Sequence, residues 1–231
     1  DPTRAREATA HAPPRYRVVK EIGRGGMGLV VLADDARLGR RVARKTRLGA
    51  GDDARGRLRF LEEARATAQL EHPNIVPVYD LDEAPDGTPG FSMRFVEGQS
   101  IASVLAGLRG GDAETQRRFG PAELLLVFTK VCDAVAYAHA RDVLHRDLKP
   151  DNVMLGAFGE VFVMDWGLAR VRSAAPDVRM YVAAEAEPPS SSERRVLSVR
   201  DSVQDGSLTQ VGAILGTPGY MAPEQVRGAP T

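Results

Sequence analysis

The first part of the chain shows the short apolar runs of a β-sheet. Two such runs, at residues 16–22 and 29–32, flank a cluster of glycines, and a third ends at Lys45. Runs of this length separated by turn residues predict an antiparallel meander. The next segment, residues 58–70, carries apolar side chains at helical spacing and predicts a helix that ends before Pro73.

The pattern changes from strand to helix near the middle of the chain. Strands are predicted at residues 75–79 and 91–96, and a hinge follows at residues 97–98. Beyond the hinge, residues 101–108 and then the long run 121–140 have helical spacing. The second half is therefore predicted to be mainly helical.

Two segments show no apolar period. Residues 1–14 contain paired prolines and charges and are predicted to be a leader or linker. Residues 172–206 are rich in Ser, Pro, Glu and Arg and are predicted to be a flexible insertion. Since the chain begins at Asp1 rather than at a methionine, we interpret it as part of a longer protein.

Composition limits the classes of partner. The chain has 231 residues, 43% of them hydrophobic, which is enough for one sizeable domain or two small lobes. Its 31 Lys and Arg residues balance 31 Asp and Glu residues, so no overall field favours nucleic acid or an anionic membrane. The longest apolar stretch is interrupted by Lys130 and Asp133 and falls short of the ~18 residues of a membrane span.

The single cysteine, Cys132, lies in the apolar run 124–138 and is predicted to be a buried structural thiol. One cysteine excludes an intrachain disulfide and a cysteine-based metal site. This usage favours a reducing, cytoplasmic setting.

The glycine cluster at residues 23–30 reads GRGGMGLV and matches G-x-G-x-x-G-x-V. Such a loop lets backbone amides approach phosphate oxygens because no side chains intervene. The same glycines could belong to a dinucleotide-binding turn or to a plain turn. A dinucleotide site needs a helix after the glycines, whereas the sequence there predicts a strand.

A lysine follows on the next predicted strand. Residues 42–45 read VARK, in which Ala43 could contact an adenine ring while Lys45 reaches the α- and β-phosphates. The predicted helix that follows offers a carboxylate to hold this lysine extended. Glu63 is the preferred partner and Glu62 the alternative, and the residue that is not the partner is expected to be a solvated surface charge.

Residues 145–152, HRDLKPDN, carry the strongest signal in the chain. Phosphoryl transfer needs a carboxylate near the attacking hydroxyl, a cation near the moving phosphoryl group and oxygen ligands for a metal. Asp147, Lys149 and Asn152 are the candidates for these roles. His145 is interpreted as a packing residue and Arg146 as an anchor for a phosphate on the mobile loop.

Two further motifs follow in order. Asp165-Trp166-Gly167 comes directly after an apolar strand at residues 161–164, so Asp165 is the second candidate metal ligand. Residues 216–224, GTPGYMAPE, contain the A-P-E sequence that closes an activation segment.

Over residues 16–225 the sequence resembles the protein kinase family, and specifically the bacterial eukaryotic-like (Hanks-type) serine/threonine kinases. The resemblance implies an α+β, bilobal protein kinase-like fold. Residues 15–97 would form a small antiparallel β-sheet lobe with one helix and the hinge at its end. Residues 98–231 would form an incomplete, mainly helical large lobe, with an activation segment at residues 165–224.

The resemblance also implies a set of site residues. Met93 would be the gatekeeper, and residues 94–97 would form the hinge whose backbone holds adenine. Met154 would stack beneath the ring opposite Val30 and Ala43. The implied nucleotide site comprises Ile22, Gly23, Gly25, Gly28, Val30, Ala43, Lys45, Glu63, Met93, Arg94, Phe95, Val96 and Met154; the catalytic residues are Asp147, Lys149 and Thr217; the metal ligands are Asn152 and Asp165.

Three features depart from the family pattern. Trp166 replaces the usual phenylalanine, which predicts altered packing but retained metal binding. The long insertion has no assigned function. The chain stops at Thr231, before the remaining helices of the large lobe, so we expect exposed apolar surface, marginal stability and low or no activity for this piece alone.

The predicted function is phosphorylation of Ser or Thr hydroxyls on proteins, with ATP and Mg²⁺, or Mn²⁺ in its place. Autophosphorylation, in trans within a homodimer, is expected at Thr209, with Ser207 and Ser202 next; the alternative is that these are ordinary hydrophilic loop residues. A catalytically silent, nucleotide-binding scaffold is the alternative function, and a small-molecule phosphotransferase conflicts with the A-P-E segment. A segment outside this chain could tether the parent protein to the inner membrane.

Overall fold

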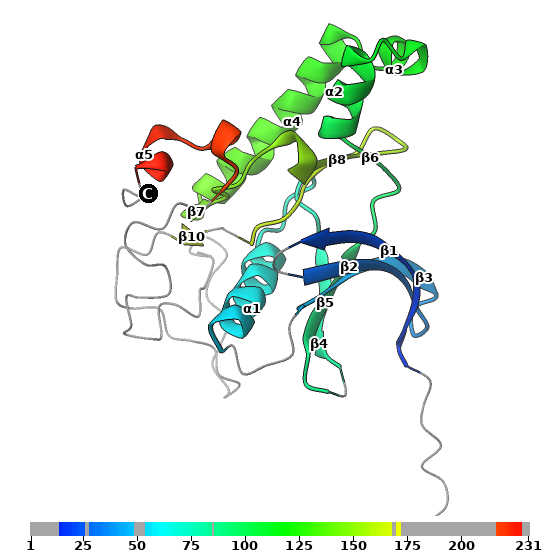
Figure 1. The fold of residues 1–231 in the computed structure, drawn as a ribbon, viewed down its shortest axis with the longest axis vertical. Coiled ribbons are helices and arrows are strands. Elements are labelled where there is room, and N and C mark those ends of the chain that lie inside the picture. Colours follow the sequence, from blue (N-terminus) through cyan, green and yellow to red (C-terminus); the bar gives the residue numbers. More distant parts are fainter. Residues whose placement is uncertain are drawn as a thin grey trace, which may run out of the picture.

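The computed structural model describes residues 14–25, 28–48, 54–84, 86–167, 170–171 and 216–227. These residues form two lobes, one built on a β-sheet and the other mainly of helices (Figure 1). The predicted α+β, bilobal fold is confirmed. Among the described residues, no helix is both long and apolar enough to cross a membrane.

The first lobe is a five-stranded antiparallel sheet with one helix beside it (Figure 1). The strand order is β1-β2-β3-β5-β4. The elements are β1 (Tyr16–Gly25), β2 (Gly28–Asp35), β3 (Arg40–Thr46), α1 (Ala54–Gln69), β4 (Val78–Glu83) and β5 (Pro89–Arg94). Phe60 and Ala64 of α1 pack against Phe91 of β5, and this apolar contact fixes the helix on the sheet.

The second lobe begins with a short strand and three helices. They are β6 (Gly98–Ser100), α2 (Ile101–Arg109), α3 (Ala113–Arg118) and α4 (Pro121–His139). Ser100 caps α2 by accepting a hydrogen bond from the Ser103 amide at 3.2 Å, and Asp112 caps α3 through the Thr115 amide at 2.8 Å. These caps satisfy helix N–H groups that have no partner inside the helix.

Short elements complete the second lobe and carry the sequence motifs. They are β7 (Val143–Leu144), the 3₁₀ turns η2 (Pro150–Asn152) and η4 (Pro218–Tyr220), β8 (Val153–Gly156), β9 (Val161–Val163), β10 (Arg170–Val171) and α5 (Pro223–Val226). The strands β6, β8 and β9 form a three-stranded sheet. Its buried side chains join those of α2 and α4 in the largest apolar core.

The structure corrects two predictions about these elements. The strand predicted at residues 75–79 starts later, because Ile75 instead makes a single parallel bridge with Val163 and β4 begins at Val78. Cys132 is exposed, not buried. The buried face of α4 is formed by Val127, Val131, Ala134 and Ala138, at steps of three or four residues, and Cys132 lies off that face.

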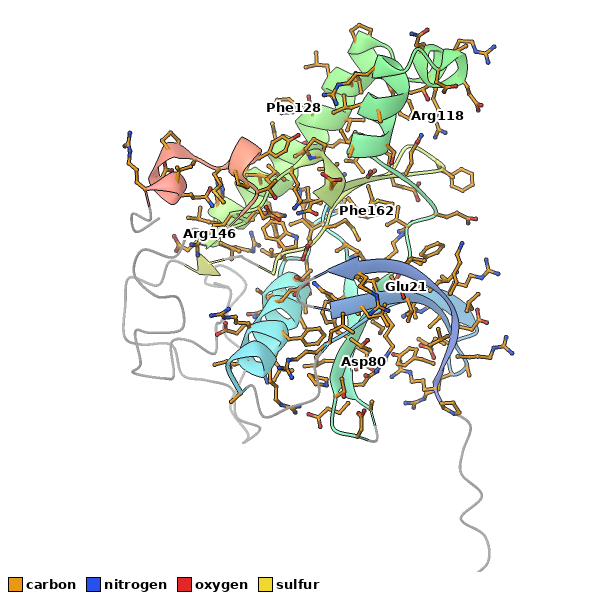
Figure 2. The ribbon with its side chains drawn as sticks, viewed as in Figure 1. Glu21, Asp80, Arg118, Phe128, Arg146 and Phe162 are labelled. Carbon is orange, nitrogen blue, oxygen red and sulfur yellow. The ribbon has the colours of Figure 1, made fainter. Side chains whose placement is uncertain are left out.

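The expected exposed apolar surface is present on α4. Leu125, Leu126 and Phe128 are all more than half exposed in the 231-residue chain, and Phe128 is labelled on this helix in Figure 2.

Candidate active site

A cleft of about 810 Å³ lies between the two lobes. Its walls come from the glycine-rich strands, β3, α1, the hinge, the segment around η2 and the end of β9. Of the predicted residues, those lining the cleft are Ile22, Gly23, Gly25, Gly28, Val30, Ala43, Lys45, Glu63, Met93, Arg94, Phe95, Val96, Met154, Asp147, Asn152 and Asp165.

The glycine-rich loop joins β1 and β2, where Gly25 pairs with Gly28. A Cβ atom on Gly28 would lie 2.6 Å from the carbonyl oxygen of Thr46, so only glycine fits there without a backbone shift. Gly26 and Met27, at the loop tip, lie outside the described residues. The predicted strand after the glycines is present as β2, which rules out a dinucleotide-binding turn in which a helix follows.

The cleft has apolar walls from both lobes. Ala43 and Met93 are cross-strand partners in the sheet, and Met93 is buried. Met154, on β8, lines the same cleft from the second lobe. Thus Val30 and Ala43 lie on one side and Met154 on the other, as expected for a slot that holds a flat ring.

Lys45 pairs with Glu63, with 2.5 Å between Nζ and Oε1, and its Nζ lies 3.2 Å from Oδ1 of Asp165. Burial lowers the pKa of Lys45, whereas the carboxylates of Glu63 and Asp165 raise it. Together the two carboxylates outweigh burial, so the net shift of this pKa is upward. Burial raises the pKa of Glu63, and Lys45 opposes this shift. The buried lysine therefore stays charged.

Glu62, the alternative partner, does not contact Lys45 through any hydrogen bond or ion pair that involves Nζ. The expectation that it would be a solvated surface charge is wrong, because Glu62 is 8% exposed. Adjacent residues on a helix point about 100° apart, so both can be buried when one faces the cleft and the other faces a neighbouring segment.

A second polar cluster surrounds Asp147. Lys149 Nζ donates to Asp147 Oδ2 at 2.9 Å and to Thr217 Oγ1 at 2.8 Å, and the Thr217 hydroxyl donates to Asp147 Oδ1 at 2.8 Å. The side-chain amide nitrogen of Asn152 donates to the backbone carbonyl of Asp147 at 2.9 Å. Burial raises the pKa of Asp147, but the hydrogen bonds from Lys149 and Thr217 outweigh it, so the net shift is downward.

His145 lies beneath this cluster and is buried. Its Nε2 donates to the Met164 carbonyl at 2.9 Å, and its Nδ1 accepts from the Asp147 amide at 3.3 Å. Burial lowers the pKa of His145, and its ring lies 4.6 Å from the ring of Trp166. The contacts therefore support a neutral, packing histidine, as the sequence suggested.

Backbone conformation at two motif residues is unusual. Arg146 has φ of 66° and Asp165 has φ of 57°, both in the left-handed region, which is costly for arginine in particular. The carbonyl of Arg146 accepts a hydrogen bond at 2.8 Å from Gln225, whose Oε1 accepts from the Ala222 amide at 3.2 Å. Arg146 is labelled beside the segment that leads to α5 in Figure 2.

Asn152 and Asp165, which both line the cleft, are the two candidate metal ligands. The described residues contain no group of three or more His, Cys, Asp or Glu side chains that could hold a metal. Asn152 donates through its nitrogen and keeps its amide oxygen for another partner, and Asp165 supplies a half-exposed carboxylate. Magnesium commonly takes one or two protein oxygens and completes its shell with phosphates and water.

Some residues of the cleft were not predicted from the sequence. Val76, Phe91 and Met164 line its inner wall. Phe91 could have been found, because it lies two residues before Met93 on the same strand and thus on the same face. Gln225 had no such local signal. The candidate phosphorylation sites Thr209, Ser207 and Ser202 lie outside the described residues.

Comparison with known proteins agrees with this geometry. A family described as "Protein kinase domain" matches residues 16–187. The chain is 38% identical over 220 residues to serine/threonine-protein kinase PknD of Protochlamydia amoebophila, covering 93% of this chain and 21% of that protein. It is 40% identical over 220 residues to PknD of Chlamydia muridarum, covering 93% and 22%. The chain thus spans about a fifth of the length of the curated relatives it matches.

Proposed function

This chain belongs to the protein kinase family, in its bacterial Hanks-type serine/threonine branch, and from that premise we propose that it transfers the γ-phosphoryl group of ATP to Ser or Thr hydroxyls of proteins. The observation that carries the proposal is the joint geometry of two clusters at one cleft. Lys45, Glu63 and Asp165 form one, and Asp147 and Lys149 belong to the other.

Each cluster has a role in the proposed reaction. Lys45, held extended by Glu63, binds phosphate oxygens of ATP inside the cleft. Asp147 orients the substrate hydroxyl and accepts its proton as the new oxygen–phosphorus bond forms and the bond to the ADP oxygen breaks. Because the transition state is loose, proton transfer comes late and a carboxylate of low pKa suffices. Lys149 stabilises the charge on the moving phosphoryl group.

A bound magnesium ion would neutralise charge on the phosphates. Asn152 and Asp165 are the residues proposed to hold it, and Mn²⁺ could replace it because both ions prefer oxygen ligands. The hinge after Met93 is proposed to bind adenine through its backbone.

Further parts of the proposal concern regulation and organisation. Residues 1–14 act as a linker or leader, residues 15–97 form the first lobe, residues 98–231 form part of the second lobe, and residues 165–224 form the activation segment. Autophosphorylation falls on Thr209, Ser207 or Ser202, in trans between two copies. Arg146 would anchor the new phosphate, since its guanidinium suits bidentate phosphate binding.

The test is transfer of labelled γ-phosphate from Mg-ATP to the protein itself and to a basic protein substrate. It compares the 1–231 chain, a chain extended beyond Thr231, and Asp147→Asn in each. Activity of either wild-type chain that the Asp147 variant lacks supports the proposal. If no wild-type chain transfers phosphate although each binds ATP, a silent nucleotide-binding scaffold replaces it.

A further inference from the structure

Arg94, the first hinge residue, lines the nucleotide cleft and also a second pocket, which Glu160 and Phe162 line from the second lobe. Arg94, the last residue of β5, forms an ion pair with Glu160, with 2.8 Å between the guanidinium nitrogen and Oε1. Its guanidinium also lies 4.9 Å from the centre of the Phe162 ring. We call Arg94, Glu160 and Phe162 the hinge latch. Figure 2 labels Phe162 between the two lobes.

Glu160 is held in place independently of Arg94. Its Oε2 accepts a hydrogen bond from the Phe158 amide at 3.1 Å, and its backbone oxygen accepts from the Gly156 amide at 2.8 Å. A Cβ atom on Gly156 would lie 2.2 Å from Oε2, so the carboxylate folds down onto a glycine. A fixed carboxylate loses little freedom when it binds Arg94, which is the main cost that weakens most surface ion pairs.

The latch acts on β9, the strand that leads to Asp165, the proposed metal ligand. Phe162 is the middle residue of β9, and its cross-strand partner is Met154, which lines the cleft. Two residues after β9 comes Asp165, the partner of Lys45. The strand is also tied to the first lobe at its other edge, where the Val163 amide donates to the Asn74 carbonyl at 2.8 Å.

We propose that the hinge latch is a positioning device for nucleotide binding. It fixes the distance between the hinge, where adenine binds, and Asp165, where the phosphates bind, by clamping β9 to Arg94. This inference rests on the proposed function of the same cleft. Glu160 does not itself line the cleft; it lines a separate pocket of about 690 Å³ on the other side of the hinge.

The sign of the effect follows from the observed state. With the latch formed, Lys45 is paired with both Glu63 and Asp165, which is the arrangement that binds phosphates. The latch therefore supports the assembled site. Breaking it should weaken ATP binding more than it slows phosphoryl transfer, because none of its side chains touches the transferred group.

The experiment measures ATP KM, kcat and the Kd of a fluorescent ATP analogue in the protein that contains this chain. Glu160→Gln keeps an acceptor for Phe158 and removes the charge. We expect ATP KM and Kd to rise about threefold to fivefold with kcat changed less than twofold, the size of a well-ordered exposed ion pair. Arg94→Gln should raise KM and Kd at least as much, because Arg94 also lines the nucleotide cleft, and the double variant should add little to the effect of Arg94→Gln alone.

Two controls make the result specific. The charge exchange Arg94→Glu with Glu160→Arg should recover at least half of the lost affinity. Glu83→Gln breaks a comparable pair, with Arg57, that lies within the first lobe and should leave KM unchanged. An unchanged KM in Glu160→Gln, an increased activity, or an equal loss in Glu83→Gln overturns the latch. Failure of the proposed function is distinct, since wild type would then be no more active than Asp147→Asn while Kd could still be measured.

Discussion

Thr217→Val is the sharpest test of the proposed catalytic cluster. Valine has nearly the shape of threonine but cannot form the hydroxyl's two hydrogen bonds, to Asp147 and from Lys149, each 2.8 Å long. A hydrogen bond to a charged group contributes about 1.5–3 kcal/mol. Lys149 and Asp147 are paired directly at 2.9 Å and can stay paired in the variant, so we count the loss of only one of the hydroxyl's two hydrogen bonds. We therefore expect kcat/KM to fall about 10- to 150-fold.

The pH profile gives a second readout for the same variant. The Thr217 hydroxyl helps Lys149 to keep the pKa of Asp147 below its usual value, against the effect of burial. Asp147 works as a carboxylate, so activity is lost as pH falls through its pKa. Removing the hydroxyl raises that pKa and should move the acid limb of the kcat/KM profile to higher pH.

The assay uses a Ser/Thr peptide and Mg-ATP, with Thr217→Ser as the matched control because serine keeps the hydroxyl. The kcat/KM of the serine variant should stay within about threefold of the wild-type value, which is a smaller effect than the loss of one typical neutral hydrogen bond. Melting temperatures check that each variant is folded. If the valine variant keeps wild-type kcat/KM, or the serine variant is equally impaired, Thr217 does not orient Asp147 and the reasoning fails.

Three further changes test other parts of the structure. Glu63→Gln should lower kcat/KM for ATP about 30-fold, because Lys45 loses its nearer carboxylate at a cost of about 2 kcal/mol. The control Glu62→Gln should change kcat/KM less than threefold. Equal losses in the two variants would refute the pairing of Lys45 with Glu63. Gly28→Ala should cost about 1–3 kcal/mol in urea unfolding, since its Cβ would overlap a backbone carbonyl of β3, and an unchanged midpoint would contradict this. Cys132 should react with a thiol reagent in the native 1–231 chain as fast as in urea, and protection would show that it is buried.

Much of the cleft could be predicted because its residues belong to motifs with local geometry. A lysine on a strand, a carboxylate on the next helix and Asp147 before a turn can each be placed from short-range patterns. The choice between Glu63 and Glu62 depends on a contact that spacing along the chain does not determine. Both lie on the inner side of α1, and helical periodicity does not tell which one faces a lysine 18 residues earlier in the chain.

Other features could not be predicted because they depend on which surfaces meet. The ion pair of Arg94 and Glu160 joins residues 66 apart, and the bond from Gln225 to the Arg146 carbonyl joins residues 79 apart. Neither pair lies in a pattern of apolar spacing. The apolar run 124–138 predicts a buried Cys132, but only one face of α4 is buried and Cys132 lies off that face.

The sequence by itself determined the main strands of the first lobe, the helices α1, α2 and α4, and which residues are candidates for phosphoryl transfer. Backbone geometry and motif spacing act over a few residues, and both are written directly in the chain. Only the tertiary structure decided which carboxylate holds Lys45, how Thr217 bridges Asp147 and Lys149, and how Arg94 reaches β9. The first two contacts form inside one lobe and the third joins the two lobes, but all of them need segments that are distant in the sequence to pack together, and spacing along the chain does not set which shapes and charges then meet.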